Sequence, residues 1–274
     1  MTREKADQSN PYDQLNEELE RMKRPERVRV SIWFVVFMLV LAAGLAALSY
    51  WQFQRLDEKQ SLMETISARS AEVPFALPAM RHWESLDASS FEYRPLIVRG
   101  SYVREGTVLV FGNLDSPKGA KGGPGYWVMT PLKLDSGGAI IVNRGFVPQG
   151  VKDWYDGHGE DVGDLSGQVE VTGIGRRSEP IGTFTPGPDI NNRIDFVRNV
   201  GRMTDLMPAE LGPFAQFYID RVAGPPGELP QGGETRLSLA NRHFEYALTW
   251  AALCVVTLVM TGIWVWRHAA PDLD

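Results

Sequence analysis

The sequence contains a single cysteine, Cys254, and only four histidines among its 274 residues. One cysteine excludes an intramolecular disulfide framework and every zinc or iron–sulfur site that needs several thiolates. Four histidines exclude a histidine-rich metal cluster, although a single imidazole can still bind a metal. Basic residues are also in the minority, with 28 Lys and Arg against 34 Asp and Glu. The net charge of -6 argues against nucleic acid as a partner, because phosphate binding requires a basic surface.

Catalytic motifs are also missing. The glycine-rich stretch 119–123 resembles a phosphate-binding loop, but it lacks the GxxxxGK[ST] spacing and does not lead into a helix. The GxG at 173–175 lacks the third glycine of a dinucleotide site, and neither HExxH nor GxSxG occurs. The acidic loop 153–161 around His158 lacks the alternating carboxylates of a calcium loop. We therefore expect no enzyme activity and interpret the acidic loop as solvated.

Two long apolar runs are the strongest positive signal. Residues 30–50 and 246–266 contain no charged residue. As a helix, each run reaches about 31 Å, roughly the thickness of the hydrocarbon core of a bilayer. The first run is too long for a cleavable signal peptide and begins too far from the first residue. We therefore predict two transmembrane helices, with the lipid bilayer as one partner.

Basic residues indicate the orientation of these helices. Arg21, Lys23, Arg24, Arg27 and Arg29 crowd the N-terminal side of the first run, and such residues resist translocation. We expect a multi-pass protein of a bacterial inner membrane, with both termini cytoplasmic. The predicted divisions are a cytoplasmic tail (1–29), a transmembrane helix (30–50), a periplasmic α+β domain (51–245), a second transmembrane helix (246–266) and a second cytoplasmic tail (267–274).

The predicted periplasmic domain is rich in short segments typical of β-strands. They contain many β-branched and aromatic residues and are separated by Gly, Pro and Asp clusters. The predicted strands are 95–103, 107–111, 126–134, 139–147, 168–174, 216–222 and 235–239. Consecutive strands of this kind indicate a small closed or half-closed sheet. The predicted fold class is an α+β membrane protein in which two transmembrane helices flank a large, mainly antiparallel β domain with short helices.

Local signals add detail to this domain. The first helix should continue beyond the bilayer to residues 73–74, because residues 54–72 lack Gly and Pro. Residues 135–138, DSGG, predict a hairpin turn, and Pro131 inside a strand predicts an edge or a bulge. A short helix is expected at 203–211. The stretch 224–233, GPPGELPQGG, should form an extended connector back to the membrane.

One histidine lies at the outer boundary of the second predicted helix. His243 comes shortly before the charge-free run, and the residues on its helical face are Tyr246, Ala247 and Trp250. The other candidates are Arg242 beside it and Trp51, Gln52 and Arg55 at the end of the first predicted span. These are the parts that a haem site needs: an imidazole for the iron, aromatic groups around the macrocycle and arginines for the propionates.

The same residues have a simpler explanation. Histidine, tyrosine and tryptophan are common at the ends of membrane helices, where they anchor the helix at the interface. The arginines would then contact lipid phosphates. On the residues alone this explanation is favoured, because such anchors are frequent.

Several motifs along the chain resemble those of a known family. They are YWQFQRLDEK (50–59), YRPLIVRGSY (93–102), GPGYWVMTPL (123–132), IIVNRGFVP (140–148) and LPQGGETRLSLANRHFEYALTW (229–250). In this order, with a predicted span at each end, they resemble the surfeit-locus family of cytochrome c oxidase assembly factors. Two positions depart from the family pattern: Phe146 stands where a tryptophan is common, and Arg193 follows Asn191-Asn192 where aromatic residues are usual.

The resemblance implies an assembly factor that binds haem a transiently and assists its insertion into oxidase subunit I. It implies His243 as the iron ligand, and subunit I and haem A synthase as protein partners. Two other functions remain open. One is a haem-free scaffold for a subunit I intermediate, since the outer domain is far larger than a haem pocket needs. The other is a two-span sensor, although its predicted cytoplasmic segments are too short to fold alone.

Overall fold

The computed structural model describes residues 31–156, 165–237 and 241–269. The chain divides into two compact units: one comprises residues 1–59 and 241–274, and the other comprises residues 60–240. We call the first the helix pair and the second the globular unit. His158 and the two predicted cytoplasmic tails, apart from residues 267–269, lie outside the described residues.

The described elements are two long helices, a short helix and eight strands, connected partly by 3-10 turns. The helices are α2 (Ile32–Ser70), α3 (Val200–Thr204) and α4 (His243–Ala269). The strands are β1 (Phe75–Ala76), β2 (Pro95–Tyr102), β3 (Val108–Leu114), β4 (Gly123–Leu134), β5 (Ala139–Pro148), β6 (Val169–Arg177), β7 (Ile194–Asp195) and β8 (Phe214–Arg221). Six of the seven predicted strands are confirmed with small shifts at their ends.

Both long helices are apolar enough to cross a membrane. The best 18-residue windows of α2 and α4 have mean hydropathies of 2.5 and 2.0, with few of their residues buried in the protein. An apolar helix that leaves its side chains exposed is typical of a membrane span. The chain is thus compatible with a membrane protein. The predicted span boundaries within these longer helices stay predictions.

Helix α2 continues well past its charge-free part, as the sequence predicts. It runs for 39 residues and ends at Ser70, four residues before Pro74. Good helix formers sustain the polar half, and the proline disfavours helical geometry at the residue before it. The division between the two units falls within this helix, after Lys59.

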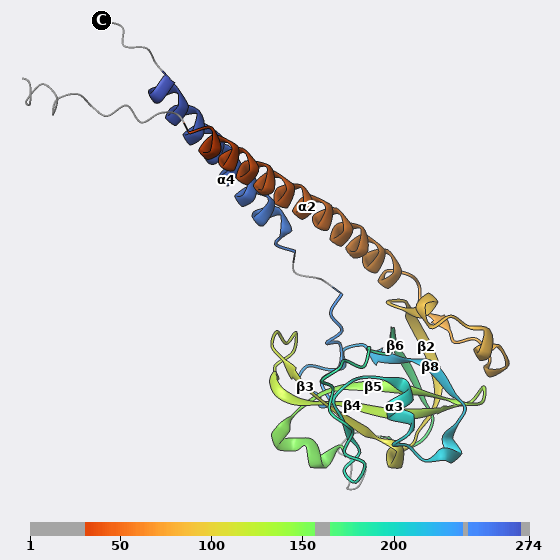
Figure 1. The fold of residues 1–274 in the computed structure, drawn as a ribbon. Coiled ribbons are helices and arrows are strands. Elements are labelled where there is room, and N and C mark those ends of the chain that lie inside the picture. The colour runs from red at the N-terminus through yellow and green to blue at the C-terminus, as the bar shows by residue number, and fades with distance from the viewer. Residues whose placement is uncertain (1–30, 157–164, 238–240, 270–274) are drawn as a thin grey trace, which may run out of the picture. The chain divides into compact units, whose positions relative to one another are not determined.

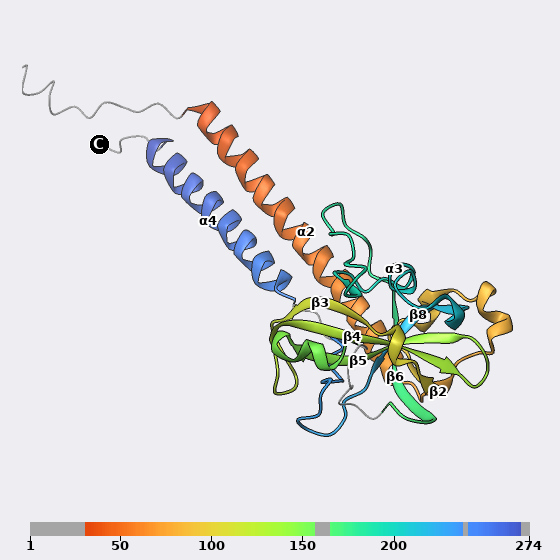
Figure 2. The same ribbon diagram turned by 90° about the horizontal axis from the view of Figure 1, so that it is seen from below.

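The sheet of the globular unit closes on itself. Its strand order is β1-β2-β6-β8-β5-β4-β3-β7, with an additional pairing between β2 and β4. The ring therefore consists of β2, β6, β8, β5 and β4, and the strands curl round in both views of the ribbon (Figures 1 and 2). Within the ring only β5 and β8 are parallel. The predicted α+β class is confirmed: along the chain, one long apolar helix precedes and another follows a barrel-like, mainly antiparallel sheet domain with short helices.

One cluster of the core lies inside this ring, and a second packs the opposite face of β5 and β8 against α3. On β2, Leu96 and Val98 are buried while Arg99 is exposed, which is the alternation of a strand with one solvent face. Strand β5 differs, because all of its residues except the last are buried. It lies between β4 and β8 and forms the centre of the sheet, as its near-continuous apolar run indicates.

Two turn predictions can be compared with the strand register. The DSGG hairpin is confirmed: it joins β4 to β5, and Gly137 and Gly138 adopt φ values of 92° and 73°. Pro131 occupies neither an outer edge nor a bulge. It lies where β4 changes partner from β3, last paired at Met129, to β2, first paired at Leu132. The missing proline N–H is tolerated at this gap, and the Pro131 carbonyl accepts a hydrogen bond from Val103 N.

Three local predictions need correction. Residues 235–237 of the predicted last strand are irregular, and the rest of that segment lies outside the described residues. The helix predicted at 203–211 is split into α3 and a 3-10 turn, Ala209–Leu211, because Pro208 interrupts it. The stretch 224–233 is not an extended connector. Its Gln231 pairs with Phe146 of β5 through two backbone hydrogen bonds, so the segment packs on the sheet.

Candidate functional site

Small side chains bring the two helices of the helix pair into contact. The Ser49 hydroxyl donates to the Ala247 carbonyl at 2.9 Å, and the Cys254 thiol lies 3.3 Å from the Ala42 carbonyl. These contacts follow one antiparallel register, and α2 and α4 lie side by side in both ribbon views (Figures 1 and 2). Small residues permit this close approach. The cysteine is a packing residue here, as its position inside the apolar run predicts.

His243 is the first residue of α4, and its imidazole meets α2. Its Nδ1 lies 2.7 Å from Oε1 of Gln52. The His243 backbone N–H is capped by the side-chain oxygen of Asn241 at 3.2 Å. The side chain is half-buried. Two of the residues predicted to form one site are therefore in direct contact, although they are 191 positions apart in the sequence.

The contact with Gln52 selects one form of the imidazole. An amide oxygen can only accept, so His243 Nδ1 carries the hydrogen and donates it. The Nε2 atom of a neutral ring then has a free lone pair, and in the part of the chain that the structure describes it makes no hydrogen bond. A histidine whose second nitrogen donates to a fixed acceptor is the usual arrangement of a metal-binding imidazole. The helix pair thus presents one imidazole nitrogen that is held in a fixed orientation and has a lone pair available for a metal ion.

The other predicted residues differ in how deeply they are buried near this contact. Trp250 is half-buried, whereas Tyr246 is 52% exposed and Trp51 is 46% exposed. Ala247, on the same predicted face as His243, is fully buried against α2. The face of α4 that meets α2 therefore contains His243 and Ala247, and Tyr246 turns outward. Their role in holding a ligand stays a prediction.

The two predicted arginines differ in their partners. The Arg55 guanidinium pairs with Glu58 at 2.8 Å and lies over the Trp51 ring, 5.7 Å from its centroid. Arg242 is exposed and has no hydrogen bond or ion pair from its side chain to any described residue. Of the two, Arg242 is the one whose guanidinium is available to a carboxylate.

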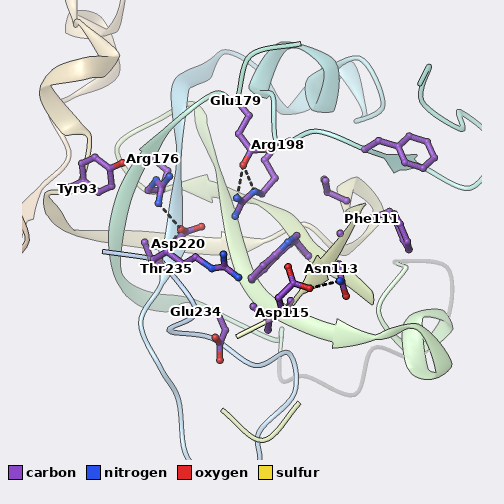
Figure 3. Close-up of a pocket in the computed structure, with 16 residues that line it drawn as sticks. Tyr93, Phe111, Asn113, Asp115, Arg176, Glu179, Arg198, Asp220, Glu234 and Thr235 are labelled. Carbon is purple, nitrogen blue, oxygen red and sulfur yellow. Dashed lines mark hydrogen bonds and ion pairs between the residues drawn. The ribbon is translucent and has the colours of Figure 1, made fainter. Parts of the chain in front are cut away.

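The globular unit contains a second candidate site, which the sequence analysis did not identify. A cavity of about 420 Å³ opens where β3, β4, β6 and β8 converge with the segment that follows Gln231 (Figure 3). Its polar lining includes Arg176, Glu179, Arg198, Asp220, Glu234, Thr235 and Arg236, and its aromatic lining is Tyr93, Phe111, Trp127 and Phe196.

A buried carboxylate lies at the base of this cavity. Asp220 on β8 is 4% exposed and accepts hydrogen bonds from the Asn143 amide and the Thr235 hydroxyl, both at 2.8 Å. The Arg176 guanidinium on β6 lies 3.9 Å from Asp220 and 3.3 Å from Glu92. A buried charge is tolerated only when it is paired in this way. The network ties three strands to the segment that leads to α4.

A second ion pair lies across the cavity. Arg198 donates to the Glu179 carboxylate from its side chain, at 2.9 Å from Nε, and from its backbone N–H at 3.0 Å. Burial alone would lower the pKa of Arg198, but the neighbouring carboxylates of Asp220 and Glu179 raise it above the ordinary value. Burial also raises the pKa of the Tyr218 hydroxyl, which therefore stays protonated.

The glycine-rich stretch at 119–123 has a structural role beside the cavity. Backbone N–H groups of Lys118 and Gly119 donate to the buried Glu234 carboxylate at 2.9 and 2.8 Å. Gln231 accepts a hydrogen bond from Lys121 N and donates to its carbonyl, at 2.9 and 2.8 Å. The backbone of this stretch therefore holds the chain's own glutamate.

The cavity residues were hard to identify from the sequence because they come from seven separate segments. The best signal was Asp220, which interrupts the apolar pattern of a predicted strand, FYIDRV. A charge at a buried position of a strand requires a partner. Its partners Asn143 and Arg176 are 77 and 44 positions away, and no local pattern connects them. Among residues 31–156, 165–237 and 241–269, no cluster of His, Cys, Asp and Glu suits a metal ion.

Comparison with known proteins identifies the family. The model of the SURF1 family matches residues 39–255, which include both long helices in part and the whole globular unit. The chain belongs to the SURF1 family. The resemblance seen in the sequence motifs is thereby confirmed.

Named relatives agree with this assignment. The chain is 30% identical to a SURF1-like protein of Monosiga brevicollis over 241 residues, which cover 83% of this chain and 85% of the relative. It is 31% identical to Surfeit locus protein 1 of Xenopus tropicalis, over 83% of this chain and 73% of the relative. The human Surfeit locus protein 1 is 29% identical, over 82% of this chain and 74% of the relative.

The two departures from the family motifs have local explanations. Phe146 is fully buried, packs edge-on against Trp127 with ring centroids 5.5 Å apart and pairs with Gln231. Arg193 has a positive φ of 50° and donates to the carbonyls of Glu105 and Asp156. Both residues therefore support the architecture around the cavity and β3, and neither lies in the helix pair.

Proposed function

We propose that this protein is an assembly factor of cytochrome c oxidase that binds haem a transiently through His243 and assists its insertion into subunit I. Membership of the SURF1 family supports the general role. The observation that supports haem binding is the contact between His243 Nδ1 and Gln52, which leaves Nε2 free to bind iron. Subunit I and haem A synthase are the proposed protein partners. The proposed location is a bacterial inner membrane, with the globular unit in the periplasm.

The residues of the helix pair fit a haem with one protein ligand. His243 would bind the iron, Trp51 and Tyr246 offer exposed rings for the macrocycle, and Arg242 offers a free guanidinium for a propionate. Haem a supplies the redox-active iron of the oxidase, while this protein only holds and orients it. A single ligand suits a carrier, because each added ligand slows release. We therefore expect no chemistry on a substrate.

The optical spectrum of the purified protein tests this function. Protein made in cells that synthesise haem A should carry haem a at a near-stoichiometric level, visible as Soret and α bands. Deletion of the gene should lower oxidase activity, because subunit I would receive less haem. An unchanged oxidase activity would exclude the assembly role, and a protein without haem bands would exclude the carrier role.

Removing the partner of the imidazole gives a finer test. Gln52→Leu should weaken haem binding by roughly ten- to a hundredfold, since loss of a hydrogen-bond partner behind a ligand has this effect in metal sites. The matched control is Gln54→Leu on the same helix, because the exposed Gln54 side chain bonds to Tyr50 and to no other described residue. Haem titration followed by absorbance measures both. Equal affinities in the two variants would show that Gln52 does not orient the ligand.

A haem-free scaffold is the second candidate function. The observation in its favour is the globular unit, residues 60–240, which contains a closed barrel with its own cavity. In this case the barrel would hold an assembly intermediate of subunit I, and the helix pair would serve as an anchor. Loss of oxidase activity on gene deletion, combined with a haem-free spectrum, would favour the scaffold.

A further inference from the structure

The cavity of the globular unit has one apolar side and one charged side. Its volume of about 420 Å³ lies within the range of small-molecule sites. Phe111 and Phe196 form an edge-to-face pair with centroids 6.3 Å apart, and Phe111 points away from the charged cluster in the close-up (Figure 3). The side chains of Arg176 and Arg198 lie at the other side, beside Asp220 and Glu179 (Figure 3).

The carboxylates of the cavity already accept hydrogen bonds. Glu179 accepts from the side chain and backbone of Arg198, and Asp220 accepts from Asn143 and Thr235. Glu234 accepts from the backbone of the glycine-rich loop and from Gln231. Asp115, at the rim, accepts from Asn113. Although acids outnumber arginines in the lining, their acceptor capacity is largely in use.

Some hydrogen-bond donors of the cavity are not fully used. Within the described residues, the exposed Arg236 side chain makes no hydrogen bond or ion pair. The Arg176 guanidinium is only partly used: its buried Nε lies 3.3 Å from the Glu92 carboxylate without making a hydrogen bond, and its Nη1 lies 3.9 Å from Asp220. Buried polar groups are nearly always paired, so unfilled donors at a cavity point to an acceptor-bearing ligand. A carboxylate is the acceptor that a guanidinium binds most strongly in two-point contact.

Aromatic rings hold two of these guanidinium groups in place. The Arg176 guanidinium lies 5.0 Å from the centroid of the Tyr93 ring, and the Arg198 guanidinium lies 5.1 Å from that of Trp127. Tyr93 itself has a φ of 65°, which is unfavourable for an aromatic residue. Strain of this kind tends to occur where a side chain must be positioned for binding. The arginines on the charged side of the cavity are therefore pre-organised.

We propose that this cavity binds a small carboxylic acid with a flat apolar body. Arg236 and Arg176 receive the carboxylate, and Phe111, Trp127 and Phe196 contact the apolar body. All these residues lie in the globular unit, so the site is separate from His243 and does not depend on haem binding.

Calorimetric titration of the full chain in lipid nanodiscs tests the proposal. The probe is naphthalene-2-carboxylate, and empty nanodiscs provide the blank. We expect one saturable site per chain and about tenfold weaker binding to Arg236→Ala, the effect of losing one charge-assisted contact. The matched control is Arg99→Ala, since Arg99 is an exposed arginine of β2 that pairs with Glu170 outside the cavity. Circular dichroism checks that both variants keep the fold.

Two comparison ligands test which part of the acid is recognised, and a variant of the helix pair tests whether the two sites are independent. Naphthalene-2-methanol, which lacks the charge, and inorganic phosphate, which lacks the apolar body, should both bind much more weakly than the acid. The acid should bind to His243→Ala as it does to the parent protein. Absence of saturable binding, equal binding of the alcohol or of phosphate, or an unchanged affinity in Arg236→Ala would each overturn the proposal. Loss of acid binding in His243→Ala would overturn the separation of the two sites.

Discussion

His243→Ala should abolish haem binding while the protein remains folded. The imidazole is the nitrogen ligand that Gln52 orients, and its loss should cost more than the loss of Gln52 behind it. Because a contact behind a metal ligand contributes about ten- to a hundredfold, removal of the ligand should weaken binding by at least about a hundredfold. Haem content after purification and absorbance titration with haem measure the effect. The helix pair should still form, since Ser49 keeps its contact with the α4 backbone and Cys254 keeps its contact with the α2 backbone.

The matched control for this experiment is His268→Ala. His268 lies on the same helix, is exposed and bonds through Nδ1 to the Trp264 carbonyl at 2.8 Å. It should retain the haem content of the parent. His243→Gly offers a complementary test, because free imidazole in solution should enter the vacated position and restore binding. Parental haem content in His243→Ala would remove this histidine from the site and leave the membrane-anchor explanation.

Gly145→Ala should be among the most destabilising single changes in the globular unit. Gly145 has a φ of 138°, which is unfavourable for any residue with a Cβ. An added Cβ would lie 2.4 Å from the backbone of Gln231, which pairs with the next residue, Phe146. Backbone strain and overpacking together should cost on the order of 3 kcal/mol or more. The Tm should therefore fall by roughly 6–12 °C for a domain of this size.

Thermal unfolding of Gly150→Ala provides the comparison for this prediction. Gly150 lies five residues further on, is exposed, and has open space where a Cβ would be. Its replacement should change the free energy of unfolding by about 0.5 kcal/mol or less, as is usual for surface substitutions. If both variants unfold at the same temperature, the pairing between Phe146 and Gln231 does not constrain the fold.

The sequence predicts the strands and helices of this protein well because their signals are local. The segment PLIVRGSY has a two-residue alternation that can be recognised without knowledge of the partner strand. Helix α2 could be followed to its end for the same reason, since helix formers continue up to the proline at position 74. The proximity of His243 and Gln52 could be predicted because each lies at the end of a predicted span.

The parts that sequence analysis missed depend on contacts between distant segments. Gln231 looks like part of a flexible Gly- and Pro-rich connector until β5 is seen beside it. Thr235 lies in a segment with the composition of a strand, yet its hydroxyl bonds to Asp220 instead of its backbone joining a ladder. Such side-chain contacts override intrinsic propensity, and only the closed sheet brings their partners together.

The position of β8 has a consequence for incomplete chains. This strand is the last of the barrel in the sequence, yet it lies between β6 and β5 instead of at an edge. In a chain that stops before Phe214, β6 and β5 therefore lack the strand that lies between them, and their backbone hydrogen-bonding groups on that side are unpaired. Exposed edges of this kind recruit other chains and promote aggregation. The sheet can close into a barrel only after β8 has been synthesised, shortly before the ribosome reaches α4.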